Sequence, residues 1–151
     1  MTIYLACTVR GDRAGVAAAR AIASRLERHG HRVLTLHLLD DAVDDLEAAL
    51  TSESVFQRDV RWLDECDALV AEASGSSYGV GFEVGYVTAR APATGQRVFL
   101  LYDAAKRSSV SRLVAGNNDR HCTTFAYDSL AALERFIDRH FGPIAPILRL
   151  P

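Results

Sequence analysis

Short apolar runs alternate along this chain with stretches in which apolar residues recur at helical spacing. The apolar runs, each compatible with a buried strand, cover residues 3–7, 32–37, 68–71, 98–102 and 123–125. The helical stretches cover residues 14–29, 52–65, 82–91, 110–115 and 129–140. Parallel strands need a long crossover that is usually a helix, so this alternation predicts a parallel sheet with helices on both faces.

The predicted fold class is therefore α/β, with one flavodoxin-like or Rossmann-like domain built on a five-stranded parallel sheet. The chain has 151 residues, of which 49% are hydrophobic. That is enough for one full core and too little for two ordinary domains. We assign residues 1–142 to this domain and residues 143–151, which are apolar and contain prolines, to a C-terminal tail.

Charge and composition argue against several classes of function. The formal net charge is −2 and no long basic run occurs, so a general nucleic-acid surface is not expected. No apolar run approaches the length of a membrane span, and the first residues lack a basic leader. The three cysteines and five histidines show no metal-binding spacing. We expect a cytoplasmic protein with reduced thiols, no metal, no cofactor and a small-molecule substrate.

In a parallel α/β sheet, ligands bind at the carboxyl ends of the strands, where the strand order reverses. The loops after Cys7, His37 and Ala71 should therefore form the site. After the third predicted strand, Gly79 and Gly81 are expected to let the backbone turn sharply and approach a ligand. Glu83 then falls in the first turn of the helix predicted from residue 82, where acidic residues are favoured in any case.

Four motifs in register make the chain resemble the 2′-deoxynucleoside 5′-phosphate N-hydrolase family and its relatives, the nucleoside 2′-deoxyribosyltransferases. They are Ile-Tyr-Leu-Ala-Cys-Thr-Val-Arg-Gly at 3–11, Gln-Arg-Asp-Val-Arg-Trp-Leu at 57–63, Ser-Ser-Tyr-Gly-Val-Gly-Phe-Glu-Val-Gly at 76–85, and a Ser-to-Gly helix at 111–116. Each motif alone is modest, but together they cover nearly the whole chain in order.

The resemblance implies hydrolysis of the N-glycosidic bond of a nucleoside 5′-monophosphate in two displacements. Glu83 would attack the anomeric carbon and form a glycosyl-enzyme ester, which water would then hydrolyse. Asp59 matches the family's second carboxylate, and we assign it proton transfer to the leaving base. Tyr4 matches a family tyrosine that could orient the Glu83 carboxylate. His37 also matches a family histidine, but a structural role is favoured for it.

The resemblance also implies how the phosphate is held and how the protein assembles. Donors to the phosphate would come from the loop after the first strand and from the turn before Glu83. The expected substrate-binding residues are Thr8, Arg10, Gly11, Ser77, Gly79, Gly81 and Ser111. Ser111 matches a serine that reaches the phosphate in the neighbouring subunit, so the resemblance implies a homodimer with shared sites.

The chain departs from the family pattern at three places. Cys7 stands where the family has glycine, which could narrow the space beside the first loop. Residues 90–96 look longer than in the family and are predicted to be a surface loop. Residues 40–54 resemble no part of the family and are predicted to shape the pocket for the base. Within them, the acidic residues 40–50 are predicted to form a short helix or a mobile loop.

Two rival functions remain open on the sequence. A deoxyribosyltransferase would use the same nucleophile, but those enzymes carry an acidic residue where Ser77 stands, and a carboxylate there would repel a phosphate. A nucleotide-binding sensor could keep the fold without turnover. The presence of both Glu83 and Asp59 favours the enzyme.

Overall fold

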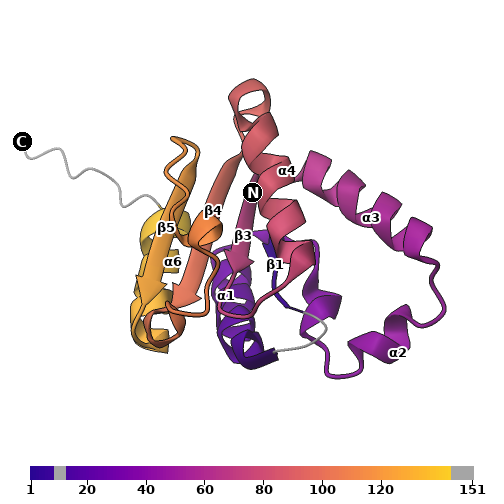
Figure 1. The fold of residues 1–151 in the computed structure, drawn as a ribbon, viewed down its shortest axis with the longest axis horizontal. Coiled ribbons are helices and arrows are strands. Elements are labelled where there is room, and N and C mark those ends of the chain that lie inside the picture. The colour runs from indigo at the N-terminus through magenta and orange to yellow at the C-terminus, as the bar shows by residue number, and fades with distance from the viewer. Residues whose placement is uncertain (9–12, 144–151) are drawn as a thin grey trace, which may run out of the picture.

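The sheet contains five parallel strands, as the alternating pattern predicts. The structure is a computed structural model that describes residues 1–8 and 13–143. The strands are β1 (Thr2–Ala6), β2 (Arg32–Val33), β3 (Ala68–Glu72), β4 (Arg97–Asp103) and β5 (Cys122–Tyr127), in the order β2-β1-β3-β4-β5 (Figure 1). This is the flavodoxin-like order, in which the direction of winding reverses between β1 and β3.

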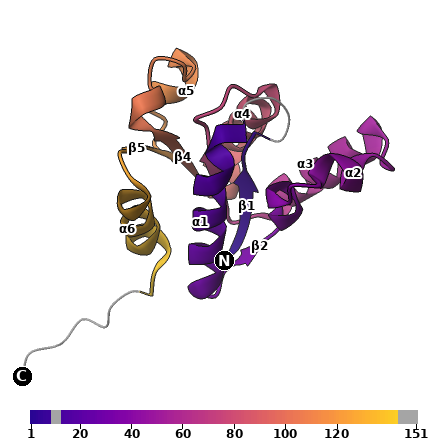
Figure 2. The ribbon, with the colours of Figure 1, turned by 90° about the horizontal axis from the view of Figure 1, so that it is seen from below.

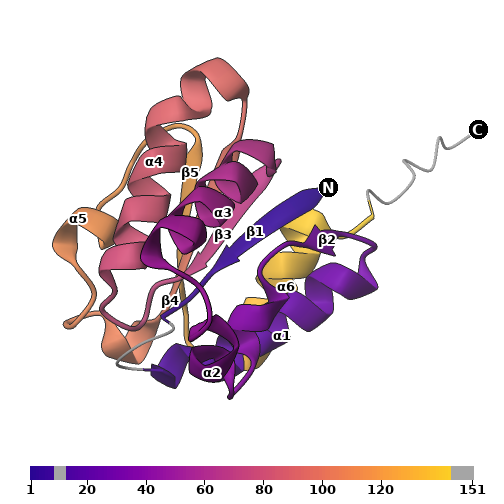
Figure 3. The same ribbon diagram turned by 90° about the vertical axis from the view of Figure 1, so that its right-hand side faces the viewer.

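Helices cover both faces of the sheet, which confirms the predicted architecture. The α-helices are α1 (Val16–Arg28), α2 (Val43–Glu47), α3 (Ser52–Glu65), α4 (Tyr78–Thr94), α5 (Arg112–Ala115) and α6 (Leu130–Phe141). Three short 3-10 helices add η1 (Arg13–Gly15), η2 (Leu36–Leu39) and η3 (Ala104–Lys106). Figure 2 shows α1 and α6 on one side of the sheet and α4 and α5 on the other. In Figure 3, α3 lies beside α4.

Alternate residues of the strands pack against opposite layers of helices, because successive side chains of a strand point to opposite faces. Ile3 and Leu5 are buried in the cluster formed with α1 and α6, whereas Tyr4 and Ala6 are buried in the cluster formed with α3 and α4. This register places the Tyr4 side chain on the face of the sheet that carries α4.

Helix α4 begins four residues earlier than predicted, so the prediction of a sharp glycine turn is wrong. Ser77 caps the helix, since its Oγ accepts a hydrogen bond from the backbone N–H of Val80 at 3.3 Å. Gly79 and Gly81 lie inside the first helical turn, and neither has a positive φ. The cap overrides the weak helix propensity of the two glycines. Glu83 consequently lies in the second turn of α4.

The end of α4 also differs from the prediction. Residues 90–96 do not form an inserted surface loop, because α4 continues through Pro92 to Thr94. Pro92 stands in the last turn, where a missing backbone donor removes only one helical hydrogen bond. Gly95 then ends the helix with φ +75°, a left-handed conformation that glycine adopts without steric cost.

Strand β2 is shorter than the predicted run of residues 32–37. After Val33 the chain turns into η2, and a side chain takes over the pairing with β1. The Thr35 hydroxyl accepts from the backbone N–H of Leu5 at 3.0 Å and donates to the carbonyl of Leu5 at 2.6 Å. Because Thr35 is fully buried, this one side chain closes the edge of β1 beside the carboxyl end of the sheet.

The segment between β2 and β3 contains two short helices, η2 and α2, followed by α3, whose bounds agree with the predicted range. Among the described residues, none of the helices has both the length and the apolar content needed to span a bilayer. Cys7, Cys66 and Cys122 are free thiols, and the first two are buried.

Replacing Thr35 by valine tests whether its hydroxyl holds β1 and the chain after β2 together. Thr35→Val keeps the shape of the side chain but leaves the N–H and carbonyl of Leu5 buried without their partner. We expect a loss of about 1–3 kcal/mol in the free energy of unfolding, measured by urea denaturation. Thr123→Val, on strand β5, is the control and should change the stability by less than about 0.5 kcal/mol. Equal losses in the two variants would contradict this role.

Candidate active site

A buried tyrosine and a glutamate meet where the winding of the sheet reverses. Tyr4, on β1, is fully buried, and its hydroxyl donates a hydrogen bond to Oε1 of Glu83 at 2.7 Å. The two residues are 79 positions apart in the sequence, and only the packing of α4 over β1 and β3 brings them together. Tyr4 therefore fixes one oxygen of the Glu83 carboxylate, as the sequence predicts for it.

The surroundings of Glu83 change its affinity for protons. Burial raises the pKa of Glu83 to about 7, because loss of hydration destabilises the charged carboxylate more than the neutral carboxyl group. The hydrogen bond from Tyr4 opposes this shift, and the negative charge of Asp59 adds to it. Burial and the charge of Glu83 together raise the pKa of Tyr4, so its hydroxyl stays protonated and remains a donor. Glu83 is thus a carboxylate poised to change its charge near neutral pH.

The Glu83 carboxylate lines a cavity of about 500 Å³ at the carboxyl edge of the sheet. Its lining comes from the residue after β1, from η2, from the last residue of α2, from α3 and from the start of α4. The residues are Cys7, Leu38, Glu47, Asp59, Ser76, Ser77, Tyr78, Gly79, Val80 and Glu83. The predicted loops therefore do meet at one site, and Glu83, Asp59, Ser77 and Gly79 all face the same cavity.

An arginine joins two of the acidic residues in the cavity wall. Nε of Arg58 donates to Oδ1 of Asp59 at 2.8 Å, and Nη2 of Arg58 donates to Oε1 of Glu47 at 2.7 Å. The guanidinium also lies over the ring of Trp62, 5.0 Å from its centroid. Because these contacts come from α2 and α3, Arg58 ties the segment before β3 to the wall of the cavity.

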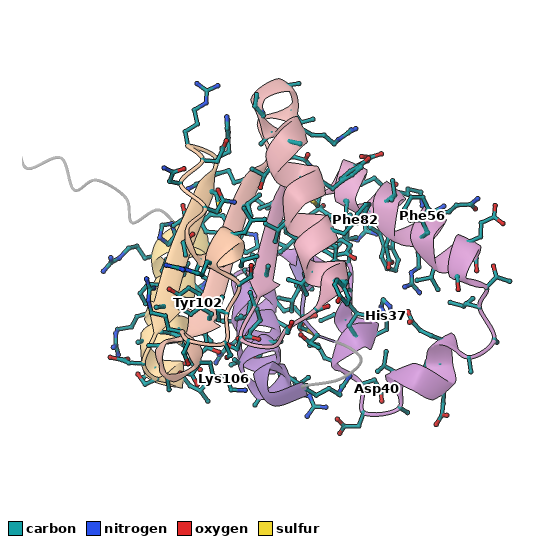
Figure 4. All side chains as sticks on the ribbon, viewed as in Figure 1. His37, Asp40, Phe56, Phe82, Tyr102 and Lys106 are labelled. Atoms are coloured by element: carbon teal, nitrogen blue, oxygen red, sulfur yellow. The ribbon has the colours of Figure 1, made fainter. Side chains whose placement is uncertain are left out.

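His37, labelled in Figure 4, lies on η2 and contacts this wall through Glu47. Its Nε2 is 3.5 Å from Oε1 of Glu47, and its ring is 5.6 Å from that of Trp62 between centroids. Burial lowers the pKa of His37, and the nearby charge of Arg58 lowers it further, while Glu47 opposes the shift. These contacts give His37 a role in packing against Glu47 and Trp62, in line with the structural role favoured by the sequence.

The predicted phosphate-binding residues are only partly brought together. Ser77 faces the cavity; its oxygen accepts in the helix cap, and its hydroxyl donates to no other described residue. Thr8 follows β1 and is buried, and its Oγ1 has no hydrogen-bond partner among the described residues. Arg10 and Gly11 lie outside the described part of the chain.

Ser111 and Gly81 do not line the cavity of their own Glu83. They line a second hollow, of about 860 Å³, between α4 and the segment that contains α5. Ser76, Ser77 and Tyr78 border both hollows, so the start of α4 separates them. Ser111 is the N-cap residue of α5, and its side chain accepts no capping hydrogen bond.

Two residues of the wall, Glu47 and Arg58, received no role from the sequence. Arg58 lies within the motif at 57–63, so its proximity to Asp59 was a signal that could have been used. Glu47 has no comparable signal, because its place depends on the contact between α2 and Arg58 of α3. Although the wall is rich in carboxylates, within residues 1–8 and 13–143 no three acidic, histidine or cysteine side chains are arranged to hold a metal ion.

Two proteins with similar sequences are named as N-hydrolases of nucleotides. A protein of Thermofilum pendens that is provisionally named 2′-deoxynucleoside 5′-phosphate N-hydrolase 1 is 39% identical over 86% of this chain and 87% of its own length. The 5-hydroxymethyl-dUMP N-hydrolase of Rattus norvegicus is 31% identical over 96% of this chain and 87% of its own length.

A solved structure shares the fold of this chain. The structure of a CMP N-glycosidase from Clostridium botulinum aligns with a TM-score of 0.66 at 16% identity, covering 92% of this chain and 98% of that one. Residues 3–125 match the family model described as nucleoside 2-deoxyribosyltransferase. On this match and on the identity to the two hydrolases, the chain belongs to the nucleoside 2-deoxyribosyltransferase family.

Proposed function

We propose that this protein hydrolyses the N-glycosidic bond of a nucleoside 5′-monophosphate, with Glu83 as the nucleophile. The observation that carries the proposal is the half-buried Glu83 carboxylate, fixed by Tyr4 and facing a cavity that also contains Asp59. The relatives named as nucleoside 5′-phosphate N-hydrolases support the same chemistry.

In the first step, an oxygen of Glu83 bonds to the anomeric carbon while the bond from that carbon to the base breaks. The bonding electrons stay on the base, which takes a proton from Asp59. In the second step, water attacks the same carbon, Asp59 accepts the proton of the water, and Glu83 leaves as a carboxylate. The products are the free base and the sugar 5-phosphate, as in a retaining glycosidase.

Tyr4 favours the form of Glu83 that attacks the sugar. Because burial raises the pKa of Glu83 to about 7, its ionised and protonated forms are both accessible near neutral pH. The Tyr4 hydroxyl donates to Glu83 and so stabilises its ionised form. The arrangement needed for attack is therefore the one that this hydrogen bond favours.

The phosphate is expected to bind where hydroxyl and amide donors meet at the start of α4. Ser77 and the backbone around Gly79 face the cavity, and Thr8 has a hydroxyl without a partner among the described residues. Arg10 and Gly11 belong to the same proposed subsite. A serine at position 77 donates to a phosphate, whereas the acidic residue of the transferases would repel it, which favours a nucleotide over a free nucleoside.

The exposed side of α4 supports the homodimer that the resemblance implies. Tyr78 and Leu113 are 101% and 86% exposed, and Gly81 and Gly85 leave the helix surface flat enough for close packing. These residues surround the hollow that contains Ser111. A second copy seated here would bring its Ser111 towards the start of α4, beside the cavity of the first.

The reaction is tested by incubating the protein with ribo- and deoxyribonucleoside 5′-monophosphates and with the matching nucleosides. Parallel incubations also contain an acceptor base. Free base is measured by chromatography. We expect base release from nucleotides only, with no need for an acceptor. Glu83→Ala should lower kcat/KM by a factor of about 10³ or more while nucleotide binding persists. Glu65→Ala, an exposed site at the end of α3, is the control. Turnover only of unphosphorylated nucleosides with an acceptor would show a transferase, and binding without any turnover would show a sensor.

The pH dependence of the reaction follows from the proposed charge on Glu83. Since the ionised form attacks, kcat/KM should rise with pH through a midpoint near 7. Tyr4→Phe removes a hydrogen bond that lowers the pKa of Glu83, so the midpoint should move to higher pH and the plateau should fall about 10-fold. Tyr86→Phe, which loses a hydroxyl bonded to Asp64 on the outside of α4, is the matched control. The phosphate of the substrate also titrates, but its titration affects both variants equally. Identical pH profiles for Tyr4→Phe and Tyr86→Phe would therefore refute the role of Tyr4.

Sharing of sites between subunits is tested by mixing two variants that are each impaired at a different residue. Ser111→Ala should raise KM for the nucleotide about 10- to 100-fold, because a hydrogen bond to phosphate is lost. When Ser111→Ala and Glu83→Ala chains are refolded together, a mixed dimer contains one site with Glu83 and the partner's intact Ser111. We expect activity above the mean of the two parents and a dimer by sedimentation. If Ser111 serves its own subunit, mixing restores nothing.

A further inference from the structure

We propose that Glu47 selects the base of the substrate by accepting a hydrogen bond from an exocyclic amine, as in cytosine or adenine. This inference rests on the proposed function, because it assigns the far wall of the same cavity. It makes Glu47 a specificity-determining residue and discriminates against bases that carry a carbonyl oxygen at that position, such as uracil and hypoxanthine.

The position of Glu47 suits contact with the base. Glu47 and Asp59 line the cavity together with Glu83, and Arg58 joins Glu47 to Asp59 by one hydrogen bond to each carboxylate. In the proposed reaction, Asp59 stands next to the nitrogen that leaves the sugar. The neighbouring carboxylate across Arg58 therefore lies further along the base, at the edge away from the sugar.

The Glu47 side chain is held in place before any ligand binds. It is only 13% exposed, and its Oε1 accepts from Arg58 at 2.7 Å and lies 3.5 Å from Nε2 of His37. Arg58 approaches from α3 and His37 from η2, so two separate elements contact this one carboxylate. A carboxylate has two oxygens with about four acceptor sites, and the contacts to Arg58 and His37 leave acceptor capacity for a ligand.

The chemistry of this wall favours a donor. An ionised carboxylate such as that of Glu47 accepts hydrogen bonds and donates none. Arg58 donates to one oxygen of Glu47 only. An exocyclic amine pairs with such a wall. A carbonyl oxygen in the same place would face the negative charge of Glu47, and no hydrogen would lie between the two oxygens. Sites built around one specific hydrogen bond strongly reject a substrate that cannot form it.

The test uses two pairs of nucleotides that differ only in this group: the 5′-monophosphates of deoxycytidine and deoxyuridine, and of deoxyadenosine and deoxyinosine. For the wild-type protein we expect kcat/KM to favour the amine at least 10-fold in a pair that is turned over. In Glu47→Gln this ratio should fall at least 10-fold, because the amide can donate to a carbonyl oxygen. Glu53→Gln, an exposed site in the first turn of α3 outside the cavity, should keep the wild-type ratio.

Circular dichroism and thermal melting of Glu47→Gln establish that a changed ratio is not a loss of folding. If that variant does not fold, Glu47→Asp, which retains the charge but withdraws it from the base, takes its place with the same expected fall. A wild-type preference for the carbonyl base, or an unchanged ratio in the folded variant, overturns the proposal.

Failure of this inference is distinguishable from failure of the proposed function. If no nucleotide releases its base, the proposed hydrolysis is wrong; if all release it at similar rates, only the role of Glu47 is wrong. Calorimetric binding of each pair to Glu83→Gln gives a second measure that needs no turnover. Tighter binding of the amine nucleotide supports the role of Glu47, and equal binding overturns it.

Discussion

The hydrogen bond between Tyr4 and Glu83 is the interaction on which the site depends. It joins the first strand of the sheet to the second turn of α4, and it holds a carboxylate where burial has already weakened its hydration. Without this donor the pKa of the carboxyl group would lie higher, because the hydrogen bond stabilises the ionised form. One hydroxyl therefore sets both the direction and the charge of the group proposed to attack the sugar.

The fold provides this interaction through the order of its strands. Because β1 pairs with β2 on one side and β3 on the other, the loops after β1 and β3 diverge and leave room for a ligand between them. The cap at Ser77 starts α4 immediately beyond that opening. As a result, Glu83 projects from a regular helix rather than from a flexible glycine turn, and rigid elements hold reacting groups more accurately than loops do.

The two sides of the α4 start serve different purposes in the proposed enzyme. On one side, the ion pairs of Arg58 bind α2 and α3 into a wall that faces the base. On the other, exposed apolar residues surround the hollow that contains Ser111 and offer a surface to a second copy. Ser76 to Tyr78 border both hollows, so a contact between subunits and a bound nucleotide would influence the same short segment.

The sequence by itself determined the alternation of strands and helices and the parallel sheet, because periodicity is a property of the chain alone. Its ordered motifs proposed Glu83, Asp59 and Tyr4 as site residues. It misplaced the start of α4, which the Ser77 cap decides, and the end of α4, which continues past Pro92. It also overestimated the length of β2, because the Thr35 hydroxyl replaces strand pairing with β1. Tertiary structure alone decided that Glu47 meets Arg58 and that Ser111 lies away from its own Glu83, since both depend on contacts between segments far apart in the sequence.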